Sequence, residues 1–420
     1  MNEGLSARDT ASSLQAVPAG MLLRRHRAVE RRRLARALGF LALPVLFVGA
    51  AYLLPIVIFL AAAVDNRPVA AALPRLNAVI RTIPADALPV PEVFLALTDD
   101  LRGARDARRI AALAGQLEQA MPGMRLMVNR AARNLARPNE DARAAMIAAD
   151  ARWGEVATWQ VLRREFAPVT PRHLLAALDM TRAPNGSIAA VVPDQRVFIE
   201  VILRSVTMAV QVTLGALVLG FPVAYLLASS PPRRAALLMF LVLLPFWTSL
   251  LVRTAAWAIL LEERGAVNGL LMAAGLTETP LKLMYNRLGV VIAMVYVALP
   301  FMILPLHATM KGIPAATMRA AAAHGATPLQ AFRLVYLPQA MPGIVAGSVT
   351  VCVTTVGYYV TPLLIGGPGD QMLSYFIAFF VNGTLNWPMA AALAVILLVL
   401  VLAGLALLLR LVGLRAMLAR

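Results

Sequence analysis

Six long runs of hydrophobic residues, separated by more polar segments of unequal length, dominate the sequence. Each run is close to the roughly 20 apolar residues that a helix needs to cross a hydrocarbon layer about 30 Å thick. The pattern therefore predicts an all-α, polytopic membrane protein with six transmembrane helices, at Phe40–Val64, Thr207–Ala228, Ala235–Leu261, Leu288–Leu306, Gly343–Ile365 and Met389–Leu409.

The first run allows a second interpretation, because Ala61, Ala62 and Ala63 resemble the cleavage site of a secretory signal peptide. The apolar part of a signal peptide has about 7–15 residues, and the run at 40–64 is longer than that. We therefore interpret it as a retained membrane helix.

The segment between the first two runs is long and carries charges of both signs. Apolar residues recur in it at every third or fourth position, which is typical of amphipathic helices, in Pro91–Thr98, Asp106–Ala120 and Asp141–Glu165. Asn139 suits the N-cap of the last stretch. The sequence predicts four parts: a basic segment (1–39), the first span (40–64), a helical insert (65–196) and a membrane core with five spans (197–420).

Basic residues predict the orientation of these parts. The chain is 60% hydrophobic and 15% charged, and its formal net charge is +17. Cytoplasmic loops of membrane proteins are enriched in Lys and Arg. Basic residues here flank the spans on alternate sides, at 24–36, 233–234, 311–333 and 410–420. We expect both termini and these loops in the cytoplasm, where they contact anionic lipid rather than nucleic acid, and the insert outside.

Residues that could carry catalysis are sparse. Cys352 is the single cysteine, which excludes an internal disulfide and a cysteine-based metal cluster. Lys282 and Lys311 both lie outside the Gly-Lys-Ser/Thr motif that binds nucleotide phosphates. The four histidines show no ligand spacing, and the six runs contain no internal Asp or Glu. We therefore expect neither an enzyme nor a cofactor or metal site in this chain.

The loop at 311–342 has strong helix signals. Pro314 suits the first turn of an alanine-rich helix at Ala315–His324, and Gly325 suits a left-handed cap at its end. Thr327 and Gln330 then form the pattern of a capping box, and Pro338 is expected to close the second helix. Two short helices around a glycine predict a compact cytoplasmic knob.

The same loop resembles the EAA loop of bacterial ABC-importer permeases, with Arg319 in place of the usual glutamate. Three further segments are similar to the spermidine/putrescine-type subfamily, namely Leu244–Thr254, Tyr296–Met302 and Tyr358–Met372. The resemblance implies that the knob is a coupling helix that docks into an ATPase subunit, through Arg319, Ala320, Ala321, Gly325, Ala326, Leu337 and Pro338.

The resemblance also implies the type I ABC-importer permease fold in a bacterial inner membrane. The expected partners are a second permease subunit, which makes a heterodimer, two ATPase subunits that bind ATP and Mg²⁺, and an extracytoplasmic binding protein. The expected cargo is a polyamine or a related small organic solute.

Polar and aromatic residues in the spans are candidates for the translocation path, since polar groups in lipid tend to face protein or water. They are Trp247, Arg253, Trp257, Tyr296, Thr354, Tyr358, Tyr359 and Thr361. Helix–helix hydrogen bonding by the threonines, an interfacial place for the tryptophans and a structural role for Arg253 are alternatives. A gate loop, or a plain turn, is expected at Gly366, Gly367, Pro368 and Asp370.

Two other functions are compatible with six spans. A stand-alone secondary transporter would need ion-coupling carboxylates inside the spans, which the sequence lacks. A membrane-anchored sensor built on the insert would leave most of the spans without a purpose. The ABC-importer permease is therefore the leading hypothesis.

Overall fold

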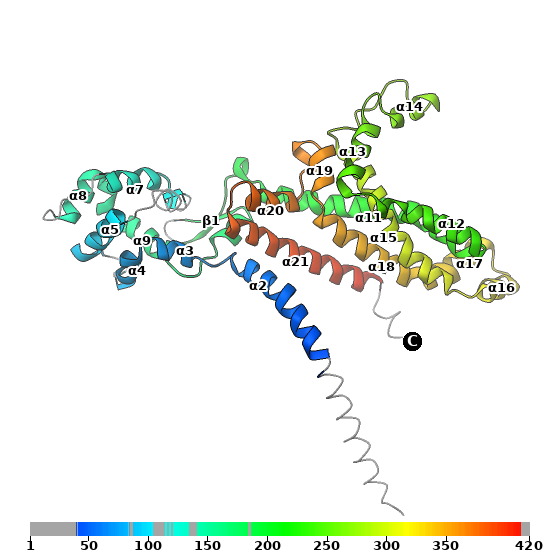
Figure 1. Ribbon diagram of the computed structural model, residues 1–420, viewed down its shortest axis with the longest axis horizontal. Helices are drawn as coiled ribbons and strands as arrows, with labels where there is room; N and C mark the ends of the chain where they lie inside the picture. The colour runs from blue at the N-terminus through cyan, green and yellow to red at the C-terminus, as the bar shows by residue number, and fades with distance from the viewer. Residues whose placement is uncertain are drawn as a thin grey trace, which may run out of the picture. The chain divides into compact units, whose positions relative to one another are not determined.

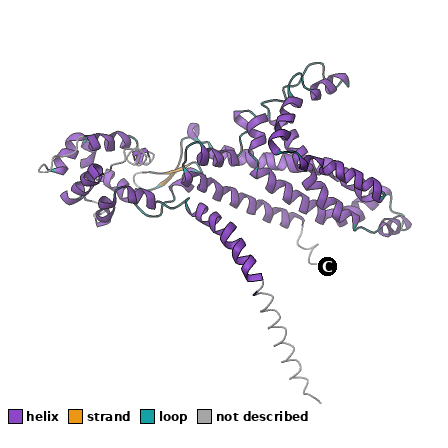
Figure 2. Cartoon of the chain, viewed as in Figure 1, coloured by secondary structure: helices purple, strands orange, loops and turns teal. Residues whose placement is uncertain are grey.

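The computed structural model describes residues 39–412 except 40, 83, 85–86, 104–113, 116, 119–120, 134–140 and 184–185 (Figure 1). The basic segment before residue 39, Asn139 and most of the stretch Asp106–Ala120 lie outside the described residues. Helices form nearly all of the regular structure that is described (Figure 2). The chain divides into two units, Met1–Phe59 and Leu60–Arg420.

The first candidate span is helical from Leu41 to Ala61. It contains a wide π-helical turn at Gly49–Leu53, which is followed by α2 (Leu54–Ala61). Pro55 is the second residue after the wide turn. A proline lacks the N–H of an α-helical hydrogen bond and its ring clashes with the carbonyl four residues earlier, so the wider turn lets the helix continue through it.

Within the described residues, five helices are long and apolar enough to cross a membrane, or six if one bent pair counts as a single span. This confirms the expected all-α, polytopic fold class. In the second unit, α11 (Phe198–Ser229), α15 (Arg287–Lys311) and α18 (Leu337–Gly357) pack side by side, and α21 (Trp387–Val412) lies along α18 (Figure 1).

Small residues let the central helices approach one another closely. A Cβ atom at Gly347 in α18 would lie 3.1 Å from the Met302 carbonyl oxygen in α15. A Cβ atom at Gly215 in α11 would lie 2.8 Å from Cγ2 of Val295 in α15. Contacts of this kind stabilise membrane helices by van der Waals packing, because lipid tails are as apolar as the side chains.

The third hydrophobic run, Ala235–Leu261, is not the continuous helix that its composition predicts. The structure has α12 (Pro232–Leu243), a 3₁₀ turn (Leu244–Trp247), α13 (Leu250–Leu261) and α14 (Ala266–Ala273). The two halves are bent by 100° at the break. Pro245 cannot donate a helical hydrogen bond, and the Ser249 side chain accepts one from the Val252 N–H, which starts α13 as a new helix.

The fifth run is also divided differently from the prediction. Pro338 does not close the second helix of the knob, because α17 (Pro328–Ala331) continues through a π-helical turn (Phe332–Tyr336) into α18. The wide turn before Pro338 repeats the arrangement before Pro55. At its other end α18 stops at Gly357, and a short α19 (Val360–Ile365) follows after a break at Tyr358 and Tyr359.

The insert is built from short helices around an apolar core. They are α3 (Arg67–Ala72), α4 (Pro74–Val79), α5 (Pro91–Gly103), α7 (Met124–Arg133), α8 (Ala142–Ala149), α9 (Val156–Glu165) and α10 (Arg172–Ala176), with 3₁₀ turns at Ile80–Thr82, Ala151–Gly154 and Pro193–Gln195. Trp153, Trp159 and Phe94 are fully buried, and the indole N–H of Trp159 donates to the Trp153 carbonyl oxygen at 2.9 Å.

Two features of the insert differ from the expectation. The stretch Asp141–Glu165 is not one helix, because the Asp150 side chain accepts a hydrogen bond from the Arg152 N–H and starts a separate 3₁₀ turn. A two-stranded antiparallel sheet, β1 (Met180–Arg182) with β2 (Ile188–Ala190), interrupts the helices. All six strand residues are exposed. Because neither strand buries one of its faces, the alternation of apolar and polar residues that predicts a half-buried strand is not required here.

Candidate functional site

The predicted knob forms a helix, a glycine turn and a second helix. Helix α16 (Ala315–Ala323) is preceded by Pro314, which lies just before the first turn rather than in it. Gly325 has φ +80°, and the Gly325 and Ala326 N–H groups donate to the Ala322 and Ala321 carbonyl oxygens at 2.9 and 3.1 Å. This is a Schellman cap.

A reciprocal capping box opens the second helix. The Gln330 N–H donates to Thr327 Oγ1 at 3.4 Å, and the Thr327 N–H donates to Gln330 Oε1 at 2.9 Å. The structure thus brings Arg319, Ala320, Ala321, Gly325 and Ala326 together in the knob. Leu337 and Pro338 lie apart from them at the start of α18.

Aromatic residues connect the base of the knob to α11, a feature that the sequence interpretation missed. Tyr336 is buried and packs edge-on against Tyr225, with ring centroids 5.4 Å apart. Phe332 packs edge-on against Phe221 at 5.9 Å. Phe221 and Tyr225 are four residues apart, and so are Phe332 and Tyr336. Residues at this spacing lie on one face of a helix, so the spacing could have indicated two aromatic faces that pack together. The base of the knob is therefore in contact with α11 and continuous with α18.

Several path candidates from different helices meet within the second unit. Thr354, Tyr358 and Thr361 line one small cavity of about 10 Å³, together with residues of α15. A cavity of this size holds at most about one water molecule. The hydroxyls of Thr254 and Thr361 lie 3.4 Å apart, and the rings of Trp257 and Tyr296 lie 5.3 Å apart.

The remaining candidates lie at helix breaks. Trp247 ends the 3₁₀ turn and is 84% exposed, and Tyr359 lies at the break after α18. The Arg253 guanidinium donates to the Pro245 and Thr248 carbonyl oxygens at 2.6 and 2.9 Å. The Pro245 carbonyl oxygen also accepts from the Thr248 N–H and hydroxyl at 3.2 and 2.8 Å, so Arg253 joins a hydrogen-bond network that holds the bend. These bonds favour the structural alternative for Arg253.

The predicted gate loop is held in place at both sides. The Asp370 carboxylate accepts a hydrogen bond from the Gly367 N–H at 3.1 Å and lies 3.4 Å from Nε of Arg287 at the start of α15. The Tyr285 N–H donates to the Ile365 carbonyl oxygen at 2.7 Å. Gly366, Gly367, Pro368 and Asp370 form a compact turn between α19 and α20 (Leu373–Asn382).

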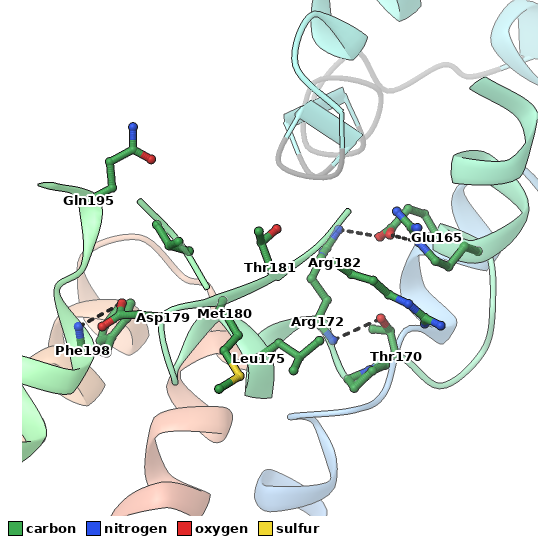
Figure 3. Close-up of a pocket in the computed structure, with 14 residues that line it drawn as sticks. Glu165, Thr170, Arg172, Leu175, Asp179, Met180, Thr181, Arg182, Gln195 and Phe198 are labelled. Carbon is green, nitrogen blue, oxygen red and sulfur yellow. Dashed lines mark hydrogen bonds and ion pairs between the residues drawn. The ribbon is translucent and has the colours of Figure 1, made fainter. Parts of the chain in front are cut away.

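Asp179 joins the insert to the first helix of the core. It follows α10 with φ +52°, and its carboxylate accepts hydrogen bonds from the Val197, Phe198 and Ile199 N–H groups at 3.1, 3.1 and 2.7 Å. Figure 3 shows the bond to Phe198. Those amides belong to the N-terminal turn of α11, where helical partners are missing and the helix dipole favours a negative charge. Asp179 therefore acts as an N-cap from outside the helix.

A cavity of about 270 Å³ lies beside Asp179, between the end of α9, α10 and β1. The buried Glu165 carboxylate is 2.9 Å from the guanidinium of Arg172 and 3.5 Å from that of Arg164 (Figure 3). Among the described residues, no group of three or more His, Cys, Asp and Glu side chains is placed to hold a metal ion.

His173, next to Arg172 in α10, gives this region a pH dependence. Burial, together with the positive charge of Arg172, lowers the pKa of His173 to about 4 from its usual 6.5. The unfolded chain binds the proton more tightly, so the insert should lose stability as the pH falls from about 6.5 to about 4, by up to about 3 kcal/mol. Hydrogen exchange of the amides in residues 172–182 measures this.

The variant His173→Leu is the matched control, because it fills the same buried position without a titratable ring. Its hydrogen exchange, corrected for the intrinsic effect of pH, should be flat across this window. Equal pH dependence in the variant and the parent protein would assign the effect to another group.

Comparison with known proteins identifies the class. Residues 196–413 match the family described as "Binding-protein-dependent transport system inner membrane component". The match covers more than half of the chain and leaves out the insert and the first span. The chain belongs to this family, and it is a multi-pass inner-membrane permease component of an ABC importer.

Individual relatives agree with this assignment. The chain is 36% identical over 200 residues to the spermidine/putrescine transport system permease protein PotB of Escherichia coli, covering 48% of this chain and 73% of the relative. It is 37% identical over 220 residues to the inner membrane ABC transporter permease protein YdcU of the same organism, covering 48% and 68%.

Among solved structures, the chain is similar to one of a bacterial alginate ABC transporter in complex with an alginate pentasaccharide-bound periplasmic protein. The similarity covers 51% of this chain and 80% of that one, with 20% sequence identity and a TM-score of 0.41.

Proposed function

We propose that this chain forms part of the translocation path of an ATP-driven importer of polyamines. The observation that carries the substrate class is the 36% identity to a permease named for spermidine and putrescine transport. Family membership favours this function over a stand-alone secondary transporter and over a sensor built on the insert.

The energy would come from separate ATPase subunits, which bind ATP and Mg²⁺ and receive the knob at α16 and α17. Support comes from the knob itself. Its two caps make it a preformed unit, its helix α16 has no buried residue, and the aromatic pairs connect it to α11. Closure of the ATPase pair would move two such knobs together and switch the spans between inward-open and outward-open states.

Specificity for the polyamine would lie mainly in an extracytoplasmic binding protein. An ammonium group is attracted by carboxylates and aromatic faces. The membrane-embedded helices offer the Trp257 and Tyr296 rings but no carboxylate in the described parts of their interiors, since Glu200 lies in the first turn of α11, and Glu262, Glu263 and Asp370 lie beyond the helix ends. A translocation path with low affinity for the polyamine lets the substrate leave, while the binding protein captures it with high affinity. A second permease subunit would complete the path, with both termini of this chain in the cytoplasm.

The test is uptake of radiolabelled putrescine and spermidine by cells that lack this chain, with and without complementation. We expect ATP-dependent uptake only with the chain. A variant in which an equally long Gly-Ser linker replaces residues 315–326 should lose uptake at least tenfold while remaining in the membrane, because α16 and the glycine turn are replaced but both flanking spans are kept. Uptake that does not depend on the chain would contradict the polyamine assignment.

A further inference from the structure

The part of the knob from Gly312 to Phe332 carries a single formal charge on a surface of small side chains. Arg319 is the only Lys, Arg, Asp or Glu from Gly312 to Phe332, and it lies in the middle of α16. Its neighbours along that helix are mainly alanines, and most of them are exposed. Helix α16 therefore presents an exposed surface of small apolar side chains with one guanidinium group on it.

The chain provides no carboxylate nearby in sequence to pair with Arg319. No Asp or Glu occurs from Thr279 to Gly369, a stretch that includes all of α15, the knob and α18. The Arg319 side chain is exposed and forms no ion pair with another described residue. A guanidinium keeps its charge at any physiological pH, so a partner that covers this surface must supply the opposite charge or leave a buried charge without compensation.

We propose that the knob docks into a groove of the ATPase subunit that is apolar along its walls and carries one carboxylate placed to meet Arg319. This inference rests on the proposed function and adds the chemistry of the partner surface. The planar guanidinium favours a carboxylate, because the two groups form paired hydrogen bonds of fixed geometry.

The surface around Arg319 favours a protein groove over a lipid headgroup layer. Anionic lipid is typically recognised by clusters of four to eight basic residues. From Gly312 to Phe332 the knob has one basic residue, and the exposed Lys311 and Arg333 at its two ends bring the total only to three. Exposed apolar side chains lie beside them, of which Leu329 is 62% and Leu334 is 74% exposed. Alanines along α16 permit close approach of a partner, as the contact of a helix with a fitted groove requires.

The first experiment compares Arg319→Glu with Arg234→Glu. Arg234 is exposed near the start of α12, in another loop expected on the cytoplasmic side, so its variant makes the same change of net charge away from the knob. The affinity-tagged parent chain is purified from native membranes, and the co-purified ATPase subunit is identified by mass spectrometry. We expect Arg319→Glu to reduce retention of this subunit at least tenfold and Arg234→Glu to leave it unchanged.

A second variant locates the carboxylate directly. Arg319→Lys places an amine at this position, in a chain whose only other lysines are Lys282 and Lys311. A water-soluble carbodiimide joins an amine to a carboxylate only when the two are in contact. We expect an amide bond between residue 319 and one Asp or Glu of the ATPase subunit, found by mass spectrometry of the linked peptides. Replacing that acid by Arg should restore retention of the Arg319→Glu variant.

The outcomes separate this inference from the proposed function. If no ATPase subunit is retained by the parent chain, the proposed function fails. If the subunit is retained equally by the parent chain and by Arg319→Glu, and residue 319 forms no link to it, the importer assignment stands and the acidic groove is wrong. If Arg319→Glu instead weakens binding of the chain to vesicles containing phosphatidylglycerol and still retains the ATPase subunit, Arg319 contacts lipid. That result would also overturn the inference.

Discussion

Replacing Asp179 by alanine should release the N-terminal turn of α11. Three N–H groups lose their acceptor, and a negative charge is removed from the positive end of a helix of 32 residues. Hydrogen bonds to a charged group contribute about 1.5–3 kcal/mol and an N-cap about 0.5–2 kcal/mol, so we expect a local loss of about 2–3 kcal/mol. Hydrogen exchange in residues 197–201 should become roughly 30- to 150-fold faster.

Two further variants separate the cap from the backbone strain of Asp179. With φ +52°, an alanine at this position also bears the strain of a left-handed conformation, which glycine avoids. Asp179→Gly should therefore isolate the loss of the carboxylate, and Asp179→Asn, which keeps one acceptor oxygen, should exchange at an intermediate rate. If all three variants exchange like the parent protein, the carboxylate does not stabilise α11.

The Asp179 cap also predicts how the insert affects transport. Its carboxylate joins the insert to the first core helix by hydrogen bonds, and α10 packs against α21 in addition. If α11 moves during the transport cycle, a weakened cap should lower the rate of uptake without removing the chain from the membrane. Uptake by Asp179→Gly cells, normalised to the amount of chain, measures this.

Replacing Gly366 by alanine should disrupt the candidate gate loop. The added Cβ would lie 2.6 Å from the Pro362 carbonyl oxygen and 2.9 Å from Cγ2 of Val290. One of these contacts is with backbone, so α19 or the loop must shift, at a cost of about 1–3 kcal/mol. Because the same loop holds Asp370 against Arg287, we expect uptake to fall at least tenfold.

Gly369 offers a matched control three residues along the same loop. A Cβ at Gly369 meets nothing within 4 Å, and its φ is not in the left-handed region. Gly369→Ala should therefore keep nearly full uptake. Equal uptake by the Gly366 and Gly369 variants would show that the loop tolerates displacement and does not act as a gate.

Local signals in the sequence were sufficient for much of the knob. The left-handed Gly325 and the capping box of Thr327 and Gln330 were predicted and are observed. Each depends on atoms within about four residues of one another, so the residue types alone determine it. Pro338 was misjudged, because a π-helical turn accommodates the proline and only the course of the backbone reveals that turn.

Other features could not be predicted because their partners lie far apart in the chain. Asp179 caps amides 18 to 20 residues later, and no sequence pattern links the two. Hydrophobicity is high on both sides of the bend at Leu244–Ser249, so composition could not distinguish a bent pair from one continuous span.

The sequence alone determined that the chain is a polytopic helical membrane protein of the importer permease class, and where most of its spans lie. The spans follow from the cost of placing polar groups in lipid, which acts on every stretch of about 20 residues. The class follows from the resemblance of the loop at 311–342 and of three further segments to known permeases. The tertiary structure decided where the apolar runs bend, which helices approach at Gly347, and how the insert and the knob are attached to α11. These depend on which distant groups satisfy a free amide or carbonyl and on close packing between helices, and both are properties of the folded chain.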